Sequence, residues 1–94
     1  MRTPIHPGEI LAGELEFIGL SASQLAKALH VPANRVTQIV NGRRAVTADT
    51  ALRLGRFFGT GPELWLNLQK TYELDKARLE IGDLDSVARY DKSS

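Results

Sequence analysis

The feature that most constrains this chain is a pair of short helical segments, residues 22–29 and 33–40, with only three residues between them. Ser21 followed by Gln24 is the pattern of a capping box, which predicts that the first helix begins directly after Ser21. Proline disfavours helix in the residue before it, so Pro32 predicts the break between the two segments. Two short helices joined by three residues have the size of a helix-turn-helix.

The residue pattern within residues 22–41 fits two helices that cross at a steep angle. The apolar side chains that we expect to meet at this crossing are Leu25, Ala26, Leu29, Val31, Val36 and Ile39. The outward side chains of the second helix are polar instead. Arginine can pair with guanine, and asparagine or glutamine with adenine, through two hydrogen bonds each. The side chains that we expect to face the base edges of DNA are Asn34, Arg35, Thr37 and Gln38.

The charge of the chain is concentrated in its middle. Residues 21–60 carry six lysines and arginines against one acidic side chain, a net charge of +5, whereas residues 1–20 and 61–94 each sum to −2. By itself a basic stretch is equally consistent with an ordinary solvated face. Beside a helix-turn-helix it indicates a surface for a polyanion. The residues that we expect to contact DNA phosphates are Gln24, Asn41, Arg43, Arg44 and Thr47.

Helical patterns recur along the rest of the chain and strand patterns are scarce, so the expected fold is all-α with five helices. Pro7 suits the first turn of the first helix. A fourth helix, over about residues 48–58, follows Thr47, a residue type that caps helix N-termini. Pro62 is expected to begin the fifth and longest helix, which continues to about Ile81. We expect these helices to form one domain, residues 1–81, and residues 82–94 to be a short C-terminal extension.

The fifth helix has apolar side chains on two sides and therefore needs two partners. One row is expected to pack on its own domain: Leu64, Trp65, Leu68 and Tyr72. The second row is expected to form a homodimer interface: Leu66, Leu74, Ala77 and Ile81. In the alternative arrangement the C-terminal extension folds back over this row with Leu84, Val87 and Tyr90. Helix-turn-helix proteins usually bind DNA in pairs, which favours the dimer and an operator that is an inverted repeat.

Several classes of protein are disfavoured by the sequence. The chain has no cysteine, which removes disulfides, thiolate metal sites and cysteine nucleophiles. It has no apolar run of membrane-spanning length and no signal-peptide pattern, so we expect no membrane partner and a cytoplasmic location. His6 and Glu9 are too few ligands for a metal site, and no metal or cofactor is expected. Ser21 and His30 lack the context of a hydrolase, so an enzyme is the class that the sequence favours least.

Segments throughout the chain carry a family resemblance: His6-Pro7-Gly8-Glu9-Ile10-Leu11, Leu25-Ala26, Val36-Thr37-Gln38-Ile39-Val40-Asn41-Gly42-Arg43-Arg44, Gly59-Thr60 and Trp65-Leu66-Asn67-Leu68-Gln69. On these segments, residues 6–80 resemble the HigA-type antitoxins of toxin–antitoxin systems. These antitoxins are a branch of the phage-repressor-like helix-turn-helix (XRE) proteins. The resemblance implies five helices, a homodimer, repression of the protein's own operon and binding of a HigB-type RNase toxin. His30 departs from the pattern, which usually has glycine in this turn, and a left-handed histidine is tolerated at some cost.

The expected function is therefore that of a DNA-binding antitoxin and autorepressor that neutralises a HigB-type RNase. Two alternatives remain open. One is a plain helix-turn-helix transcriptional regulator with no toxin partner, and the other is a protein-interaction inhibitor with little DNA binding. The basic middle of the chain and the polar second helix of the motif favour DNA binding, whereas only the family resemblance indicates a toxin.

Overall fold

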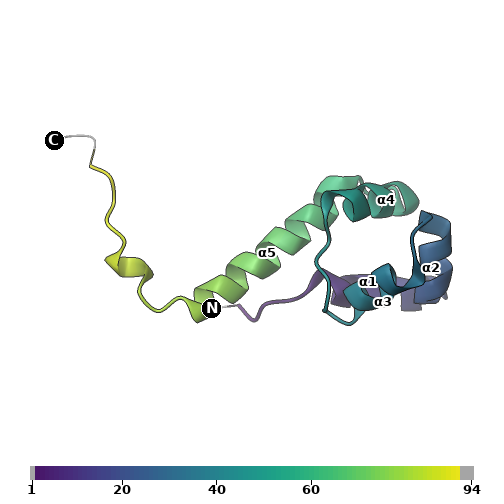
Figure 1. Cartoon of the computed structure of the whole chain (residues 1–94), viewed down its shortest axis with the longest axis horizontal. Coiled ribbons are helices and arrows are strands. Elements are labelled where there is room, and N and C mark those ends of the chain that lie inside the picture. The colour runs from purple at the N-terminus through teal and green to yellow at the C-terminus, as the bar shows by residue number, and fades with distance from the viewer. Residues whose placement is uncertain (1, 92–94) are drawn as a thin grey trace.

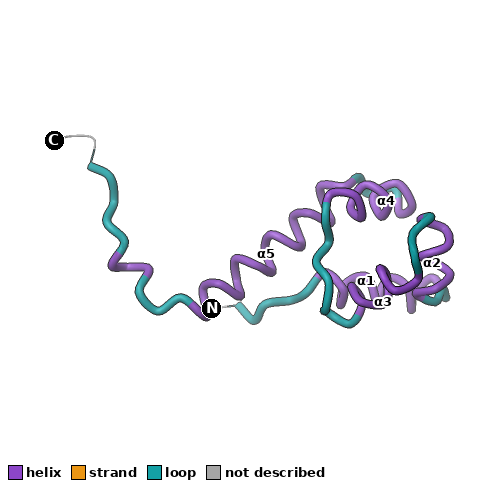
Figure 2. The backbone as a smooth tube through the Cα atoms, viewed as in Figure 1, coloured by secondary structure: helices purple, strands orange, loops and turns teal. Residues whose placement is uncertain are grey.

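The computed structural model describes residues 2–91 of the 94-residue chain, and residues 92–94 of the expected extension lie outside it. The elements in chain order are α1 (Pro7–Ile18), α2 (Ala22–Leu29), α3 (Ala33–Val40), α4 (Ala48–Phe58), α5 (Pro62–Glu80) and a 3₁₀ turn (Leu84–Ser86). The described residues form five α-helices and no strand, which confirms the all-α prediction. Helices α1 to α4 gather into a head against the start of α5, and the rest of α5 projects from it as a stalk (Figure 1; Figure 2).

Two capping boxes fix where α1 and α2 begin. Ser21 Oγ accepts a hydrogen bond from the Gln24 N–H at 3.1 Å, and Gln24 Oε1 accepts one from the Ser21 N–H at 2.8 Å, which confirms the predicted box. The second box was not foreseen: His6 Nδ1 accepts from the Gly8 N–H at 2.9 Å, and the Glu9 carboxylate accepts from the His6 N–H at 3.2 Å. These bonds satisfy backbone donors that a helix N-terminus leaves without partners.

The helix ends agree with the sequence prediction in position, although not always in how they are capped. Pro7 and Pro62 lie in the first turns of α1 and α5, and α5 ends at Glu80, one residue before the predicted end. Thr47 is the N-cap residue of α4, as predicted, but its side chain makes no capping hydrogen bond. Its hydroxyl is therefore available to other partners.

The core lies where α1, α2, α3, α4 and the start of α5 meet. Its fully buried side chains include the predicted crossing residues Leu25, Ala26, Leu29, Val36 and Ile39. On α5 Trp65 is buried and Leu68 and Tyr72 are half-buried, but Leu64 is 43% exposed, so its predicted core position is wrong. Leu64 lies beside exposed Ile10 at the edge of a shallow hollow between α5 and the N-terminal segment, where no further element covers it.

Close backbone contacts hold α1 against α3 and α4 against the start of α5. A Cβ atom on Gly8 would lie 1.8 Å from the Ile39 carbonyl oxygen, and one on Gly55 would lie 2.3 Å from the Gly61 carbonyl carbon. Only a residue without a side chain permits these approaches. The first contact places the C-terminal half of α3 directly against the start of α1, so α1 supports the helix that carries the predicted base-reading residues.

The C-terminal extension does not cover α5 in the single chain. Leu84, Val87 and Tyr90 are 57%, 65% and 84% exposed, so the described part of the extension does not fold back as the alternative arrangement required. The molecule is consequently elongated, with extents of 57 × 23 × 21 Å. Within residues 2–91, no helix has the length and apolar character needed to cross a membrane.

Candidate nucleic-acid interface

The turn between α2 and α3 has the geometry of a helix-turn-helix. His30 adopts the left-handed conformation, with φ 61° and ψ 44°, at the C-cap of α2. The N–H groups of His30 and Val31 donate to the Lys27 and Ala26 carbonyls at 3.2 and 3.0 Å. A Schellman-type ending of this kind favours glycine, so the left-handed histidine at this position carries some conformational strain.

The four predicted base-reading residues divide into two pairs. Asn34 and Thr37 are exposed on α3, and the Thr37 hydroxyl donates to the Ala33 carbonyl at 3.1 Å within the helix. Arg35 and Gln38 are half-buried and have partners outside the helix. Arg35 Nη1 donates to Asp49 Oδ2 on α4 at 2.5 Å, and Gln38 Oε1 accepts from Arg44 Nε at 2.8 Å. Each of these bonds occupies one atom of a side-chain group that can make at least two hydrogen bonds.

The predicted phosphate-contacting residues are all exposed, and they come from both ends of the motif. Gln24 lies in the first turn of α2, and Asn41 is the C-cap of α3. Arg43, Arg44 and Thr47 belong to the segment that joins α3 to α4. The structure brings Arg44 and Thr47 together with Arg35 around one hollow of about 270 Å³.

That hollow also contains residues that the sequence analysis missed. Its remaining lining comes from Ala45 and from the first turns of α4, through Asp49, Thr50 and Arg53. A signal for Asp49 was present, because it is the only acidic side chain among residues 21–60. Arg53 lies four residues later, the spacing of an ion pair along one face of a helix. Three arginines and one carboxylate therefore line this hollow, and two of the arginines, Arg35 and Arg53, bond to the carboxylate.

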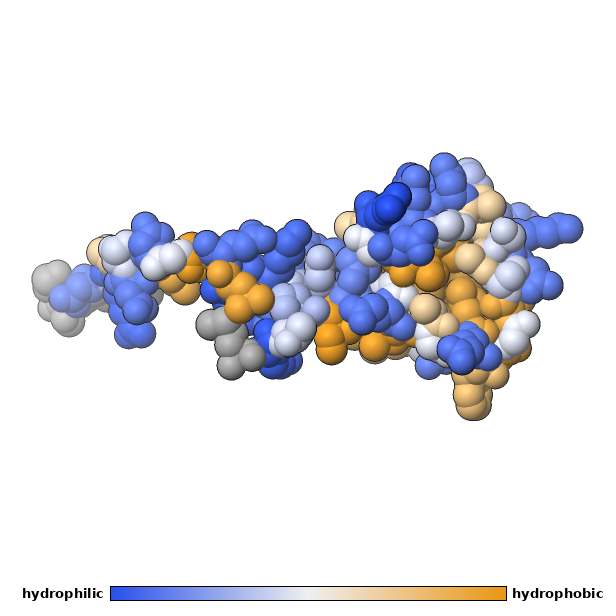
Figure 3. Space-filling model, turned by 90° about the horizontal axis from the view of Figure 1, so that it is seen from below, coloured by the Kyte–Doolittle hydropathy of each residue, from blue (hydrophilic) through white to orange (hydrophobic). Residues whose placement is uncertain are grey.

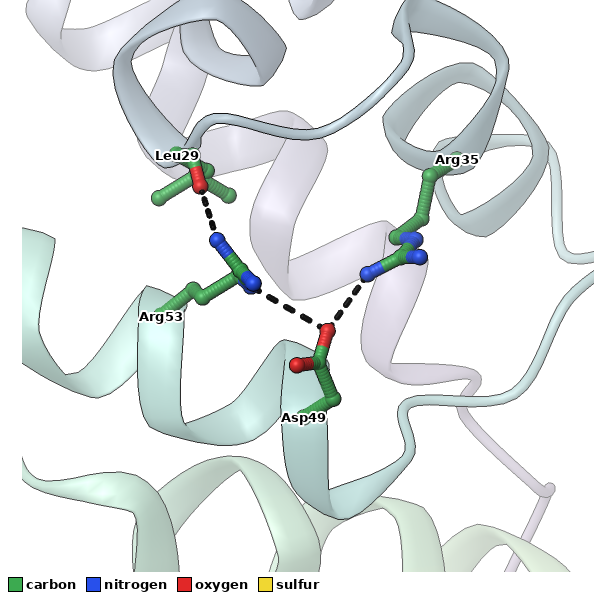
Figure 4. A network of polar contacts seen from close by, with 4 residues as sticks. All are labelled: Leu29, Arg35, Asp49 and Arg53. Atoms are coloured by element: carbon green, nitrogen blue, oxygen red, sulfur yellow. Dashed lines mark hydrogen bonds and ion pairs between the residues drawn. The ribbon is translucent and has the colours of Figure 1, made fainter.

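Asp49 is the centre of a polar network (Figure 4). Its Oδ2 accepts hydrogen bonds from Arg53 Nε at 3.1 Å and from Arg35 Nη1 at 2.5 Å, while Arg53 Nη1 also donates to the Leu29 carbonyl at 2.8 Å. The hydrogen bond from Arg53, with help from Arg35, lowers the pKa of Asp49 below its usual value despite some desolvation. The network thus joins the end of α2, the start of α3 and the start of α4.

His6 has a structural role, because it connects α1 with α5. Its ring is buried and lies edge-on to Tyr72 of α5, with the ring centroids 4.9 Å apart. Burial lowers the pKa of His6, and the nearby Glu9 carboxylate opposes that change in part. No group of three potential metal ligands occurs among residues 2–91. His6 therefore caps α1 and contacts α5 at the same time.

The residues predicted to form a dimer lie on the surface of the single chain. Leu66, Leu74 and Ala77 line a broad, shallow hollow of about 540 Å³ along α5, and Ile81 directly follows the helix. Leu66, Leu74 and Ile81 are 37%, 47% and 46% exposed. Figure 3 shows apolar surface on the head and in smaller patches along the stalk. The homodimer stays a prediction, with this surface available for it.

Comparison with known proteins assigns the chain to a family. The helix-turn-helix family matches residues 18–65, which contain α2, α3 and α4. Virulence-associated protein I of Dichelobacter nodosus is 57% identical over 84 residues, which cover 88% of this chain and 78% of that protein. The solved structure of an addiction module antidote protein of a HigA family from Coxiella burnetii is 58% identical, with a TM-score of 0.90 over 96% of this chain and 100% of that one.

A second solved structure adds a nucleic acid. It holds the Pseudomonas aeruginosa antitoxin HigA with the higBA promoter, and its antitoxin chain is 44% identical to this one. The TM-score is 0.80, over 87% of this chain and 99% of that one. The resemblance inferred from the sequence is thereby confirmed. The chain belongs to the helix-turn-helix family, in the branch that contains the HigA-type antitoxins.

Proposed function

We propose that this protein is a DNA-binding antitoxin that represses its own operon and neutralises a HigB-type RNase toxin. The observation that carries the DNA-binding part is the arrangement of α3. Its inner side chains Val36 and Ile39 are buried, while its outer side is polar and adjoins the basic hollow between α3 and α4. A helix held in this way can enter the major groove with its polar side chains against the bases.

In the proposed complex, Asn34, Arg35, Thr37 and Gln38 contact base edges, and Gln24, Asn41, Arg43, Arg44 and Thr47 hold the phosphates. The exposed position of Asn34 in the first turn of α3 supports its part, since N-terminal residues of a recognition helix contact bases. The net charge of +5 over residues 21–60 supports the phosphate contacts. The similarity to an antitoxin solved with promoter DNA supports repression as the outcome of binding.

The same proposal includes a homodimer on an inverted-repeat operator. The apolar hollow on α5 supports it, because one copy leaves Leu66, Leu74 and Ile81 partly exposed. A second copy with the same surface would cover these side chains. The two recognition helices would then meet half-sites about one helical turn apart, roughly 34–36 Å.

The toxin part of the proposal is supported by the family and by charge. Residues 1–20 and 61–94 each have a net charge of −2, in contrast with the basic middle of the chain. An RNase binds a polyanion and therefore has a cationic surface, which acidic segments can complement. Because the acidic segments differ from the DNA-facing residues, one molecule can hold toxin and DNA at different surfaces.

Binding to DNA from the protein's own upstream region tests the first part. The measurement is fluorescence anisotropy with an upstream duplex and a scrambled duplex of equal length. Asn34→Ala should weaken binding to the upstream duplex by roughly 1–3 kcal/mol and reduce the preference over scrambled DNA. Asn67→Ala, an exposed asparagine on α5, is the matched control and should bind as the wild type does. Equal binding of wild type to both duplexes would refute sequence-specific recognition.

Co-expression tests the second part. The neighbouring reading frame alone should arrest growth, and co-expression of this chain should restore it. Restoration should survive Asn34→Ala, because the proposed surfaces for toxin and DNA differ. A neighbour that is harmless alone would leave the plain transcriptional regulator as the function. Restoration of growth without any binding to upstream DNA would instead indicate the protein-interaction inhibitor.

A further inference from the structure

Asp49 occupies an unexpected position for an acidic residue, because it lies within the proposed DNA-binding surface. We propose that Asp49 is a specificity-determining residue, whose carboxylate withholds Arg35 from phosphates and releases it where a guanine edge takes its place. The inference rests on the proposed DNA-binding function and adds to it a residue that acts on DNA through another side chain. Its first support is that Asp49 is the only acidic side chain among residues 21–60.

The contact between Asp49 and Arg35 is direct and joins two different helices. Arg35 Nη1 lies 2.5 Å from Asp49 Oδ2, and the Arg35 side chain is 29% exposed. In Figure 4 the Arg35 side chain extends from α3 toward Asp49 in the first turn of α4. The bond occupies one of the five guanidinium N–H groups, so Arg35 retains the donors that a base edge requires.

Arg53 keeps Asp49 in place whether or not Arg35 is bound. Arg53 Nε donates to the same Asp49 oxygen at 3.1 Å, and Arg53 Nη1 is anchored on the Leu29 carbonyl at 2.8 Å. The Asp49 side chain is also 54% exposed, so water can hydrate it when Arg35 departs. Release of Arg35 therefore does not leave an unpaired buried charge, which would otherwise cost several kcal/mol.

The consequence for specificity follows from what each kind of DNA offers to Arg35. A loose guanidinium would contact phosphates on any sequence, and such contacts add affinity without sequence information. Asp49 already supplies an oxyanion, so a phosphate gains little by replacing it. A guanine presents O6 and N7 as two acceptors in a fixed geometry, and recognition there depends on those hydrogen bonds more than on the positive charge that the ion pair with Asp49 cancels. Asp49 therefore lowers affinity for random DNA more than affinity for the operator.

A double-mutant cycle separates this effect from plain charge repulsion. Asp49→Asn removes the carboxylate charge with almost no change in shape, and it is combined with Arg35→Ala to give four full-length proteins. Each is titrated by fluorescence anisotropy against an operator duplex, located by footprinting upstream of the gene, and a scrambled duplex at one salt concentration. The quantity compared is the specificity ratio, the affinity for operator divided by that for scrambled DNA.

The expected result is a change that depends on Arg35. In the wild-type background Asp49→Asn should raise affinity for scrambled DNA by about tenfold, the order set by one freed phosphate contact, and lower the specificity ratio at least about threefold. In the Arg35→Ala background it should raise affinity for both duplexes equally and leave the ratio unchanged. Asp49→Glu retains a carboxylate and should preserve the wild-type ratio. Thermal unfolding of each variant shows whether it is folded.

Three results would overturn the inference. The ratio could stay the same in Asp49→Asn, it could fall equally without Arg35, or operator affinity alone could fall, which would mean that Asp49 orients Arg35 instead of withholding it. The wild-type protein also tests the proposed DNA-binding function, on which this inference rests. If wild type does not prefer the operator, specific DNA binding fails as well, whereas a wild-type preference with an unchanged variant defeats the Asp49 inference alone.

Discussion

The contact between α1 and α3 predicts that two identical substitutions in one helix will have opposite effects. Gly8 and Gly13 both lie in α1, and both can be replaced by alanine. A Cβ atom at position 8 would lie 1.8 Å from the Ile39 carbonyl oxygen, whereas one at position 13 would meet no atom within 4 Å. Real Cβ contacts are essentially never under 3.0 Å, so Gly8→Ala must move α1 and α3 apart by about 1 Å.

The structure sets the expected size of the difference. Separation of the helices loosens Leu11, Val36 and Ile39, each only 1% exposed, and overpacking of this kind costs about 1–3 kcal/mol. Gly13→Ala should instead stabilise the protein by roughly 0.5–1 kcal/mol, because alanine restricts the unfolded chain and favours helix. The two variants should therefore differ in free energy of unfolding by about 1.5–4 kcal/mol. For a domain of this size that corresponds to about 6–32 °C in Tm.

Urea unfolding followed by circular dichroism measures the free energies, and operator binding is measured below each transition. Gly8→Ala should also weaken operator binding, because the displaced α3 carries the proposed base-reading residues, whereas Gly13→Ala should bind normally. The reasoning would be refuted by a Gly8→Ala protein as stable as Gly13→Ala and equal to it in operator affinity.

Three further predictions concern other parts of the molecule. Arg43→Ala should weaken operator and scrambled DNA alike and reduce the slope of log affinity against log salt by about one, whereas Arg89→Ala, in the C-terminal extension, should leave the slope unchanged. Leu74→Asp should convert the proposed dimer to a monomer in light scattering, and a wild type that is monomeric at high micromolar concentration would contradict the dimer. Burial lowers the pKa of His6, so the unfolded state binds its proton more readily, and stability should fall as the pH drops through 6.5 toward the lowered value. His6→Asn keeps a capping acceptor that does not titrate, and its unfolding midpoint should lose this pH dependence; an unchanged dependence would assign it to other groups.

The sequence alone determined the features that depend on residues within one turn of each other. Ser21 and Gln24 predicted the start of α2 because a capping box joins residues only three positions apart. Helical spacing placed Val36 and Ile39 in the core of α3, since that spacing fixes which side chains share a face. The sequence showed that His30 replaces the usual glycine of this turn, and the structure showed that it adopts the left-handed conformation. The family resemblance likewise depends on short segments that the sequence displays directly.

Only the tertiary structure decided which distant groups meet. Asp49 could be noted in the sequence as a lone acid, but its bond to Arg35 joins residues 14 positions apart on different helices. The ring contact between His6 and Tyr72 depends on how α5 crosses the start of α1. Helical periodicity specifies the directions of side chains around one axis and carries no information about the distance or angle to a second axis. The crossing of the helices is set by the packing of the whole core, and it is this crossing that pairs Arg35 with a carboxylate.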